Sequence, residues 1–178
     1  LIHAPEVYVL NDPLANACVP LLGDSRRPVV ILNSGIVSLL NSNELEFTIG
    51  HELGHLGLRH SPKEDSDNEY SALQSRSAQR YAEISADRVG LVASQSLFTG
   101  AYVMVKLASG LSTEHLSLDV DAFIEQAQRD PDEISREWEL SNTHPSLPLR
   151  LWALVQFSKS SEYSRIVGQG DYGESLES

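Results

Sequence analysis

The stretch from His51 to His55, which reads His-Glu-Leu-Gly-His, constrains this chain more than any other feature of its sequence. On a helix, residues four positions apart leave the same face, so both imidazoles can reach one tetrahedral metal ion. Glu52 then lies beside the ion instead of on it, where a carboxylate can take a proton from water. The motif therefore predicts a helix that carries a zinc-dependent hydrolytic site, with His51 and His55 as ligands and Glu52 as general base.

The segment around this motif has the signals of a capped, amphipathic helix. We predict Asn43 as the N-cap, with Glu46 three residues later as in a capping box. His51 and His55 fall outside the apolar stripe, and His60, at the polar end, is expected to be a surface or capping residue. Apolar residues at intervals of three and four predict the face that anchors the helix in the core: Leu45, Ile49, Leu53 and Leu56.

A second long helix, predicted over about residues 70–94, offers a third metal ligand. Glu83 and Asp87 lie one turn apart on it, and two carboxylates at this spacing repel each other, so a compensating cation is expected. We predict Glu83 as the third ligand, because catalytic zinc has three protein ligands and an open fourth position. Asp87 would accept the far N–H of a ligand histidine. The alternative is a local salt bridge to Arg80 or Arg88.

The rest of the chain predicts an α+β fold that is mostly helical, with a small sheet packed on the zinc helix. Strands are expected at residues 7–10 and 29–32, because both are short β-branched runs bounded by turn residues. A short helix is expected at 36–40 and a loop at 61–68. The run 97–111 is too short to span a membrane and contains Lys106, so it is expected to be a core helix.

The carboxy-terminal part predicts one more helix and then a tail. Ser146 is expected to cap this helix, with Pro148 in its first turn. We predict its apolar side from Leu151, Trp152, Val155 and Phe157. The domain limits that follow are residues 1–167 for a single metallopeptidase domain and 168–178 for a flexible tail or the start of a linker.

The amino-acid composition limits the kinds of partner that this chain is expected to bind. The formal net charge is −12, with 13 Lys and Arg against 25 Asp and Glu, so no nucleic-acid surface is expected. The single cysteine, Cys18, excludes an intrachain disulfide and is expected to be a small buried residue. The first residue is Leu1 and no signal peptide opens the sequence, so we expect a piece of a longer protein. A flanking domain or membrane anchor could lie outside it, and the compartment, membrane-associated or periplasmic among others, stays open.

These motifs resemble those of the zinc metallopeptidases that include the HtpX heat-shock protease, the CAAX prenyl protease and the Oma-type mitochondrial protease, which are gluzincins. The resemblance spans most of the chain. In that family a His-Glu-x-x-His motif is followed on a later helix by Glu-x-x-Ala-Asp. The matching stretches here are His51-Glu52-Leu53-Gly54-His55, Glu83-Ile84-Ser85-Ala86-Asp87, Asn16-Ala17, residues 29–35 and Glu44-Leu45.

A further family element, His-Pro with an arginine six residues after the histidine, resembles His144, Pro145 and Arg150. The resemblance implies that His144 and Arg150 approach the zinc cleft, where they would stabilise an oxyanion or orient Glu83. Whether His144 is instead a fourth zinc ligand stays open at this point. The alternative for both residues is a capping histidine and an arginine salt bridge.

The sequence therefore predicts a zinc metalloendopeptidase that binds one Zn²⁺ per chain and cleaves protein or peptide substrates. The membrane spans of some family members are absent from the interval between the zinc motif and Glu83, so misfolded or exported protein segments, as in protein quality control, are the expected substrates. Residues 29–32 would line the cleft and pair with an extended substrate. The competing hypothesis is a latent or inactive metal-bearing module that binds peptides as a chaperone does.

Overall fold

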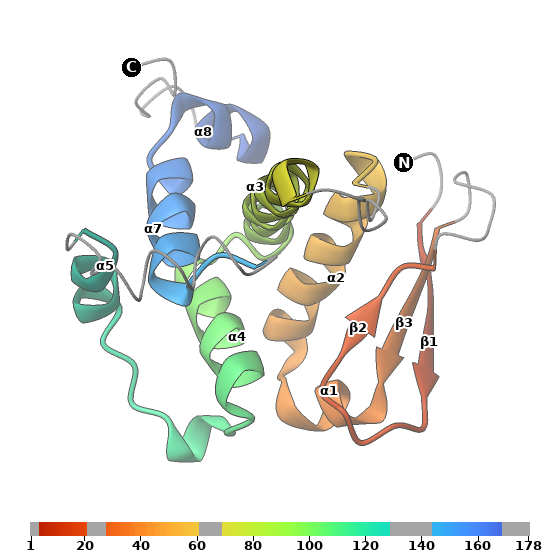
Figure 1. The fold of residues 1–178 in the computed structure, drawn as a ribbon. Coiled ribbons are helices and arrows are strands. Elements are labelled where there is room, and N and C mark those ends of the chain that lie inside the picture. The colour runs from red at the N-terminus through yellow and green to blue at the C-terminus, as the bar shows by residue number, and fades with distance from the viewer. Residues whose placement is uncertain (1–3, 21–27, 61–68, 129–143, 169–178) are drawn as a thin grey trace.

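The computed structural model describes residues 4–20, 28–60, 69–128 and 144–168, and Figure 1 shows their fold. The fold is α+β and mostly helical, as the sequence predicts. A small sheet lies at one side of the molecule, and the helices are arranged in layers beside it (Figure 1). The predicted loop 61–68 and the predicted tail, apart from Gly168, lie outside the described residues.

The sheet has three strands, β1 (Glu6–Leu10), β2 (Ala17–Cys18) and β3 (Val29–Asn33), in the order β1-β3-β2. β1 runs parallel to β3, and β2 runs antiparallel to it. Val30 and Leu32 point to the buried side, because successive side chains of a strand alternate between its two faces. Every residue of β1 is exposed. Cys18 is exposed as well, so the expectation of a buried cysteine is wrong: a two-residue strand at the sheet edge does not enclose it.

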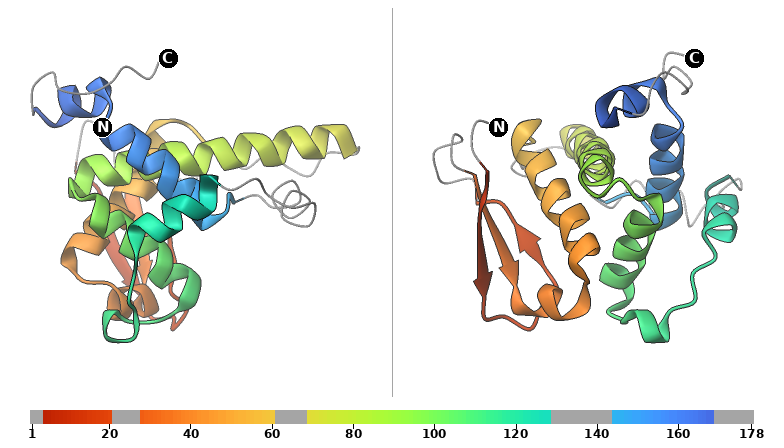
Figure 2. Two further views of the ribbon diagram at one scale, coloured as in Figure 1. Left: turned by 90° about the vertical axis from the view of Figure 1, so that its left-hand side faces the viewer. Right: turned by 180° about the vertical axis from the view of Figure 1, so that it is seen from behind.

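The helices predicted from the sequence are present in that order, and the structure adds unpredicted helices at residues 113–115, 120–128 and 161–167. The long helix α3 crosses the molecule, and its amino-terminal half projects beyond the other elements (Figure 2). Among the described residues, no helix has the length and apolar content needed to cross a membrane. The helices are α1 (Ser34–Leu39), α2 (Ser42–Gly57), α3 (Glu69–Ser94), α4 (Leu97–Ser109), η1 (Thr113–His115), α5 (Val120–Gln128), α7 (Leu147–Ser158) and α8 (Ser161–Val167).

The helix α2, which carries the His-Glu-x-x-His motif, begins two residues earlier than predicted. Its N-cap is Asn41, whose side chain accepts from Glu44 N–H at 3.0 Å, while the Glu44 carboxylate accepts from Asn41 N–H at 2.8 Å. The same carboxylate oxygen forms a buried ion pair with Lys106 of α4 at 2.7 Å. The predicted cap at Asn43 is therefore wrong, because Glu44 makes the reciprocal capping bond and is itself held in place by Lys106.

Helices α2 and α3 pack with very little between their backbones, because small residues face each other at the crossing. A Cβ at Gly54 would lie 3.0 Å from Ala86 Cα, and one at Gly50 would lie 3.1 Å from Gly90 Cα. Phe47 is the deepest large side chain of α2, at 2% exposure. The predicted stripe is displaced by this contact, since Leu45, Ile49 and Leu53 are only partly buried against the core.

The core continues into α4 and α7. Ser146 is the N-cap residue of α7 and Pro148 lies in its first turn, although the Ser146 side chain makes no capping hydrogen bond. Leu151, Val155 and Phe157 are buried as predicted, whereas Trp152 is 37% exposed. The prediction for Trp152 is wrong, because α7 instead buries Ala153 and Leu154.

Candidate active site

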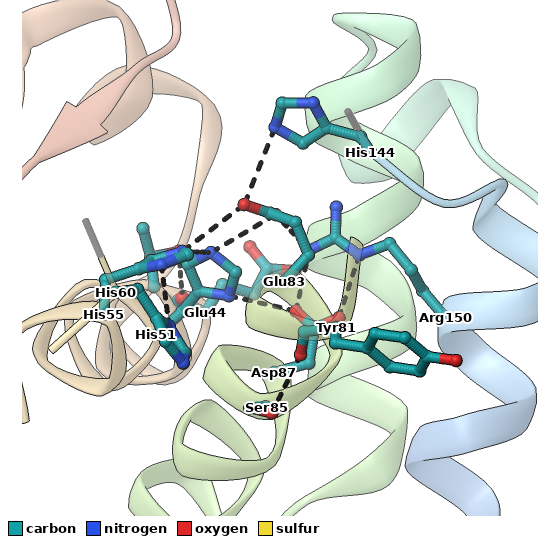
Figure 3. A network of polar contacts seen from close by, with 11 residues as sticks. Glu44, His51, His55, His60, Tyr81, Glu83, Ser85, Asp87, His144 and Arg150 are labelled. Carbon is teal, nitrogen blue, oxygen red and sulfur yellow. Dashed lines mark hydrogen bonds and ion pairs between the residues drawn. The ribbon is translucent and has the colours of Figure 1, made fainter. Parts of the chain in front are cut away.

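Three helices and the residues just before one of them bring the predicted site residues together, and Figure 3 labels these residues apart from Glu52. α2 supplies His51, Glu52 and His55, and α3 supplies Glu83 and Asp87. Arg150 comes from the second turn of α7, and His144 lies just before that helix. Because α2 and α3 cross at glycine and alanine residues, the histidines of one helix directly face the carboxylates of the other.

His51, His55 and Glu83 form a group whose donor atoms all lie within 4.8 Å of one another. The two Nε2 atoms are 3.1 Å apart, His55 Nε2 is 3.4 Å from Glu83 Oε1, and His51 Nε2 is 3.7 Å from Glu83 Oε2. Two atoms that bind one tetrahedral zinc at about 2.1 Å are about 3.4 Å apart. The three residues therefore fit a zinc ion in both donor type and spacing.

Asp87 lies behind His51, on the side away from this group. Its Oδ1 is 3.0 Å from His51 Nδ1, so the Nδ1–H can be donated to the carboxylate while Nε2 faces the group. Burial alone would lower the pKa of His51, but the hydrogen bond and negative charge of Asp87 outweigh it and raise that pKa. This arrangement fixes the ring in the tautomer that a metal ligand needs.

Arg150 holds the Asp87 carboxylate from the other side. Its Nε and one of its terminal nitrogens donate to the two Asp87 oxygens at 2.8 and 2.7 Å, and the same terminal nitrogen is 3.6 Å from Glu83 Oε2. Burial would raise the pKa of Asp87, but the charge and hydrogen bonds of Arg150 and His51 lower it. The alternative partner Arg88 lies elsewhere, with its guanidinium over the ring of Phe157. Arg150 thus contacts the carboxylates of both Asp87 and Glu83.

Glu83 keeps its charge in spite of partial burial. Burial would raise its pKa, but the hydrogen bond with His55 and the charges of His51, Arg150 and His144 lower it. His144 Nε2 is 3.7 Å from Glu83 Oε1, and the His144 side chain is 64% exposed. His144 therefore lies at the open side of the site and is not one of the three residues whose donor atoms converge.

Glu52 and the site open onto a cleft of about 510 Å³ (Figure 3 shows the polar residues beside it). Burial raises the pKa of Glu52, which makes its carboxylate a stronger base. The polar part of the cleft lining includes the site residues. The apolar part of the lining includes Ile36, Phe47, Val103, Met104, Leu107 and Leu147.

His60 also contacts the site, which the sequence did not predict. Its Nδ1 is 3.1 Å from His55 Nδ1, and burial together with the nearby histidines His55 and His51 lowers the pKa of His60. A separation of five residues does not place two side chains on one helix face, so helical periodicity gives no signal for this contact. It exists because the chain turns sharply after α2.

The known proteins that resemble this chain are named as peptidases. Residues 2–73 match the family model Peptidase family M48. A relative from Arabidopsis thaliana, "Plastoglobule-localized metallopeptidase 48, chloroplastic", is 30% identical over 192 residues, which cover 93% of this chain and 55% of the relative. The chain thus spans about half the length of this curated relative.

Shorter matches concern proteins named "Protease HtpX homolog". One from Dictyoglomus turgidum is 36% identical over 55 residues, 31% of this chain and 18% of the relative. Another from Lactobacillus helveticus is 40% identical over 52 residues, 29% of this chain and 17% of the relative. No solved structure matches the chain significantly.

Proposed function

Because this chain belongs to a peptidase family of the M48/HtpX type, we propose that it is a zinc-dependent metalloendopeptidase that hydrolyses peptide bonds in protein substrates. The observation that carries the proposal is the convergence of His51 Nε2, His55 Nε2 and a Glu83 carboxylate at spacings of 3.1 to 3.7 Å. Glu52 lines the same cleft, which gives the site a base as well as a metal-binding group.

In this proposal His51, His55 and Glu83 hold one zinc ion. When bound, zinc supplies Lewis acidity that activates water and polarises the scissile carbonyl. The two facing Nε2 lone pairs and the ionised Glu83 favour a cation, because without one these electron-rich atoms repel each other. Asp87 keeps the His51 lone pair directed into the site by accepting the Nδ1–H at 3.0 Å.

Glu52 acts as the general base and then as the general acid. It takes a proton from the attacking water and delivers that proton to the amine that leaves the cleaved peptide bond. Its raised pKa suits both steps, since a carboxylate with an ordinary pKa would be a weaker base. Its position on α2, next to His51, keeps it beside the metal-binding group and in the cleft.

His144 and Arg150 take different roles in the proposal. His144 is the more exposed and lies at the cleft mouth 3.7 Å from Glu83, so it is suited to donate a hydrogen bond to the developing oxyanion. Arg150 is 15% exposed and bonded to both oxygens of Asp87, so it positions Asp87 and Glu83 and is not free to reach substrate.

Substrate is proposed to bind as an extended segment between β2 and the apolar part of the cleft lining. The sequence expectation that residues 29–32 line the cleft and pair with substrate is not met, because none of them is among the cleft-lining residues and β3 is the central strand, paired with β1 along its length and with β2 at Ile31 and Leu32. The edge beside the site is β2, and Ala15, Asn16 and Ala17 line the cleft there. An unfolded protein segment can add to such an edge, whereas a folded protein cannot enter the cleft.

The test compares the purified chain with the variant Glu52→Gln. The wild-type chain, loaded with zinc, should cleave unfolded casein and peptides blocked at both ends. Glu52→Gln should retain about one zinc per chain and lose about 10²- to 10⁴-fold in the rate of hydrolysis. Cleavage by the variant at the wild-type rate would contradict the role of Glu52. A wild-type chain that binds zinc and peptides but cleaves none of them would support a latent peptide-binding module instead.

A further inference from the structure

The end of α2 holds His60 against His55 through the backbone. Leu58 is the C-cap, His60 N–H donates to His55 O at 2.9 Å, and Arg59 N–H donates to Leu56 O at 3.1 Å. Arg59 has φ of 57°, in the left-handed region. These are the two bonds and the left-handed residue of a Schellman cap, in a position that glycine usually occupies. The cap turns the chain back so that residue 60 lies next to residue 55.

The side chains of these two residues also meet. The Nδ1 atoms of His60 and His55 are 3.1 Å apart, and the ring centroids are 5.1 Å apart in an edge-on arrangement. The other nitrogen of His55, Nε2, faces His51 Nε2 at 3.1 Å and Glu83 Oε1 at 3.4 Å. One nitrogen of His55 is thus directed to the metal-binding group, and the other is directed to His60 (Figure 3).

If His55 is a metal ligand, the positions of the protons on His55 and His60 follow. A neutral imidazole that offers its Nε2 lone pair carries its proton on Nδ1, and that N–H needs an acceptor. The atom at 3.1 Å is His60 Nδ1, so His60 accepts only if its own proton is on Nε2. Asp87 does the same for His51, with an oxygen at 3.0 Å from Nδ1. Each histidine of the motif therefore has a hydrogen-bond acceptor on the side away from the metal-binding group: Asp87 for His51 and His60 for His55.

We propose that His60 is a positioning residue for the metal site, which accepts the Nδ1–H of His55 and thereby fixes the tautomer and the ring orientation of this ligand. The inference rests on the proposed zinc site and adds a residue to it. His60 does not touch substrate or the reacting atoms. Its contribution is made through His55, and partners of this kind change metal affinity by about 10- to 100-fold when they are removed.

The test measures zinc affinity by competition with a chromophoric chelator, so it does not depend on hydrolysis. His60→Phe keeps an aromatic ring but removes the acceptor, and we expect zinc to bind about 10- to 100-fold more weakly. His60→Asn places a carbonyl oxygen close to the position of Nδ1, and we expect it to restore most of the affinity. His115→Phe is the matched control, because His115 is 64% exposed on η1, and we expect wild-type affinity.

A second measurement reads the tautomers directly. In ¹⁵N spectra of the zinc-loaded wild-type chain, His55 should carry its proton on Nδ1 and His60 on Nε2. Wild-type zinc affinity in His60→Phe, or a His60 proton on Nδ1, would overturn the positioning role while leaving the zinc site intact. A wild-type chain that binds no zinc would instead overturn the proposed function and this inference with it. The cap bonds involve only the backbone, so the substitutions leave the turn in place.

Discussion

Gly54 and Ala86 lie so close that a Cβ at position 54 would be 3.0 Å from Ala86 Cα and 3.1 Å from Val89 Cβ. We therefore expect Gly54→Ala to push α2 and α3 apart and to lower the free energy of unfolding by about 1–3 kcal/mol, as overpacking does. Zinc affinity should also fall, because Glu83 on α3 moves away from the histidines on α2. Urea unfolding of the metal-free chain and a zinc titration measure the two effects.

Gly57 provides the control on the same helix. A Cβ there would have no heavy atom within 4 Å, so Gly57→Ala introduces no clash. Alanine in a helix is favoured over glycine, and we expect a gain of about 0.5–1 kcal/mol in the free energy of unfolding with unchanged zinc affinity. Equal effects of the two substitutions would contradict the close crossing of the helices.

Arg150→Lys tests whether the positive charge at position 150 is enough to hold the carboxylates of Asp87 and Glu83, or whether the planar guanidinium is also needed. Lysine keeps the positive charge but cannot make the two bonds to Asp87, at 2.8 and 2.7 Å, with one planar group. We expect the free energy of unfolding to fall by about 1.5–3 kcal/mol, the range for one hydrogen bond between charged groups. A variant with the wild-type urea midpoint would show that the planar pairing is dispensable.

Lys106→Met tests the buried ion pair that holds the start of α2. Glu44 would lose its partner at 2.7 Å while remaining 4% exposed, so we expect a loss of about 3–5 kcal/mol in the free energy of unfolding. The double variant Glu44→Gln with Lys106→Met should recover part of this loss. Glutamine carries no charge and can still accept from Asn41 N–H. If the double variant is no more stable than Lys106→Met, the loss of stability comes from packing and not from the unpaired charge of Glu44.

Zinc removal should lower thermal stability, since the proposed ligands come from two different helices. A metal ion that binds only the folded chain raises the free energy of unfolding by about 2.7 kcal/mol when its concentration is 100 times its Kd. We therefore expect the melting temperature to rise with added zinc and to return to the metal-free value with chelator. His55→Ala should show a much smaller response. An identical response in this variant would exclude His55 from the ligand set.

Local patterns in the sequence were enough to predict the main helices and the residues that converge on the site. The spacing of His51 and His55 and the carboxylates of Glu83 and Asp87 are properties of single helices, and a resemblance to known peptidases added His144 and Arg150. The structure brings all six of these residues into one network of contacts.

Features that depend on contacts between elements could not be predicted in this way. Asn41 with Glu44 and Asn43 with Glu46 have the same capping-box spacing, and the sequence around them does not reveal that Lys106, 62 residues away from Glu44, pairs with it. The same reason explains the exposed Cys18, because burial at a sheet edge is decided by neighbours that a sequence window does not contain. The contact of His60 with His55 has a different origin: it depends on a local turn in which Arg59 adopts the left-handed conformation that glycine usually occupies, so no glycine signals it.

The exposed strand β1 has a consequence for the isolated chain in concentrated solution. Val7, Tyr8, Val9 and Leu10 are between 45 and 62% exposed, and within the part of the chain that the structure describes β1 pairs only with β3. An apolar strand with an open edge favours intermolecular strand pairing, and a charged side chain on it suppresses such pairing. The cleft lies beside β2, at the opposite edge of the sheet. Self-association of two chains through their β1 edges would therefore produce a dimer in which both clefts remain accessible.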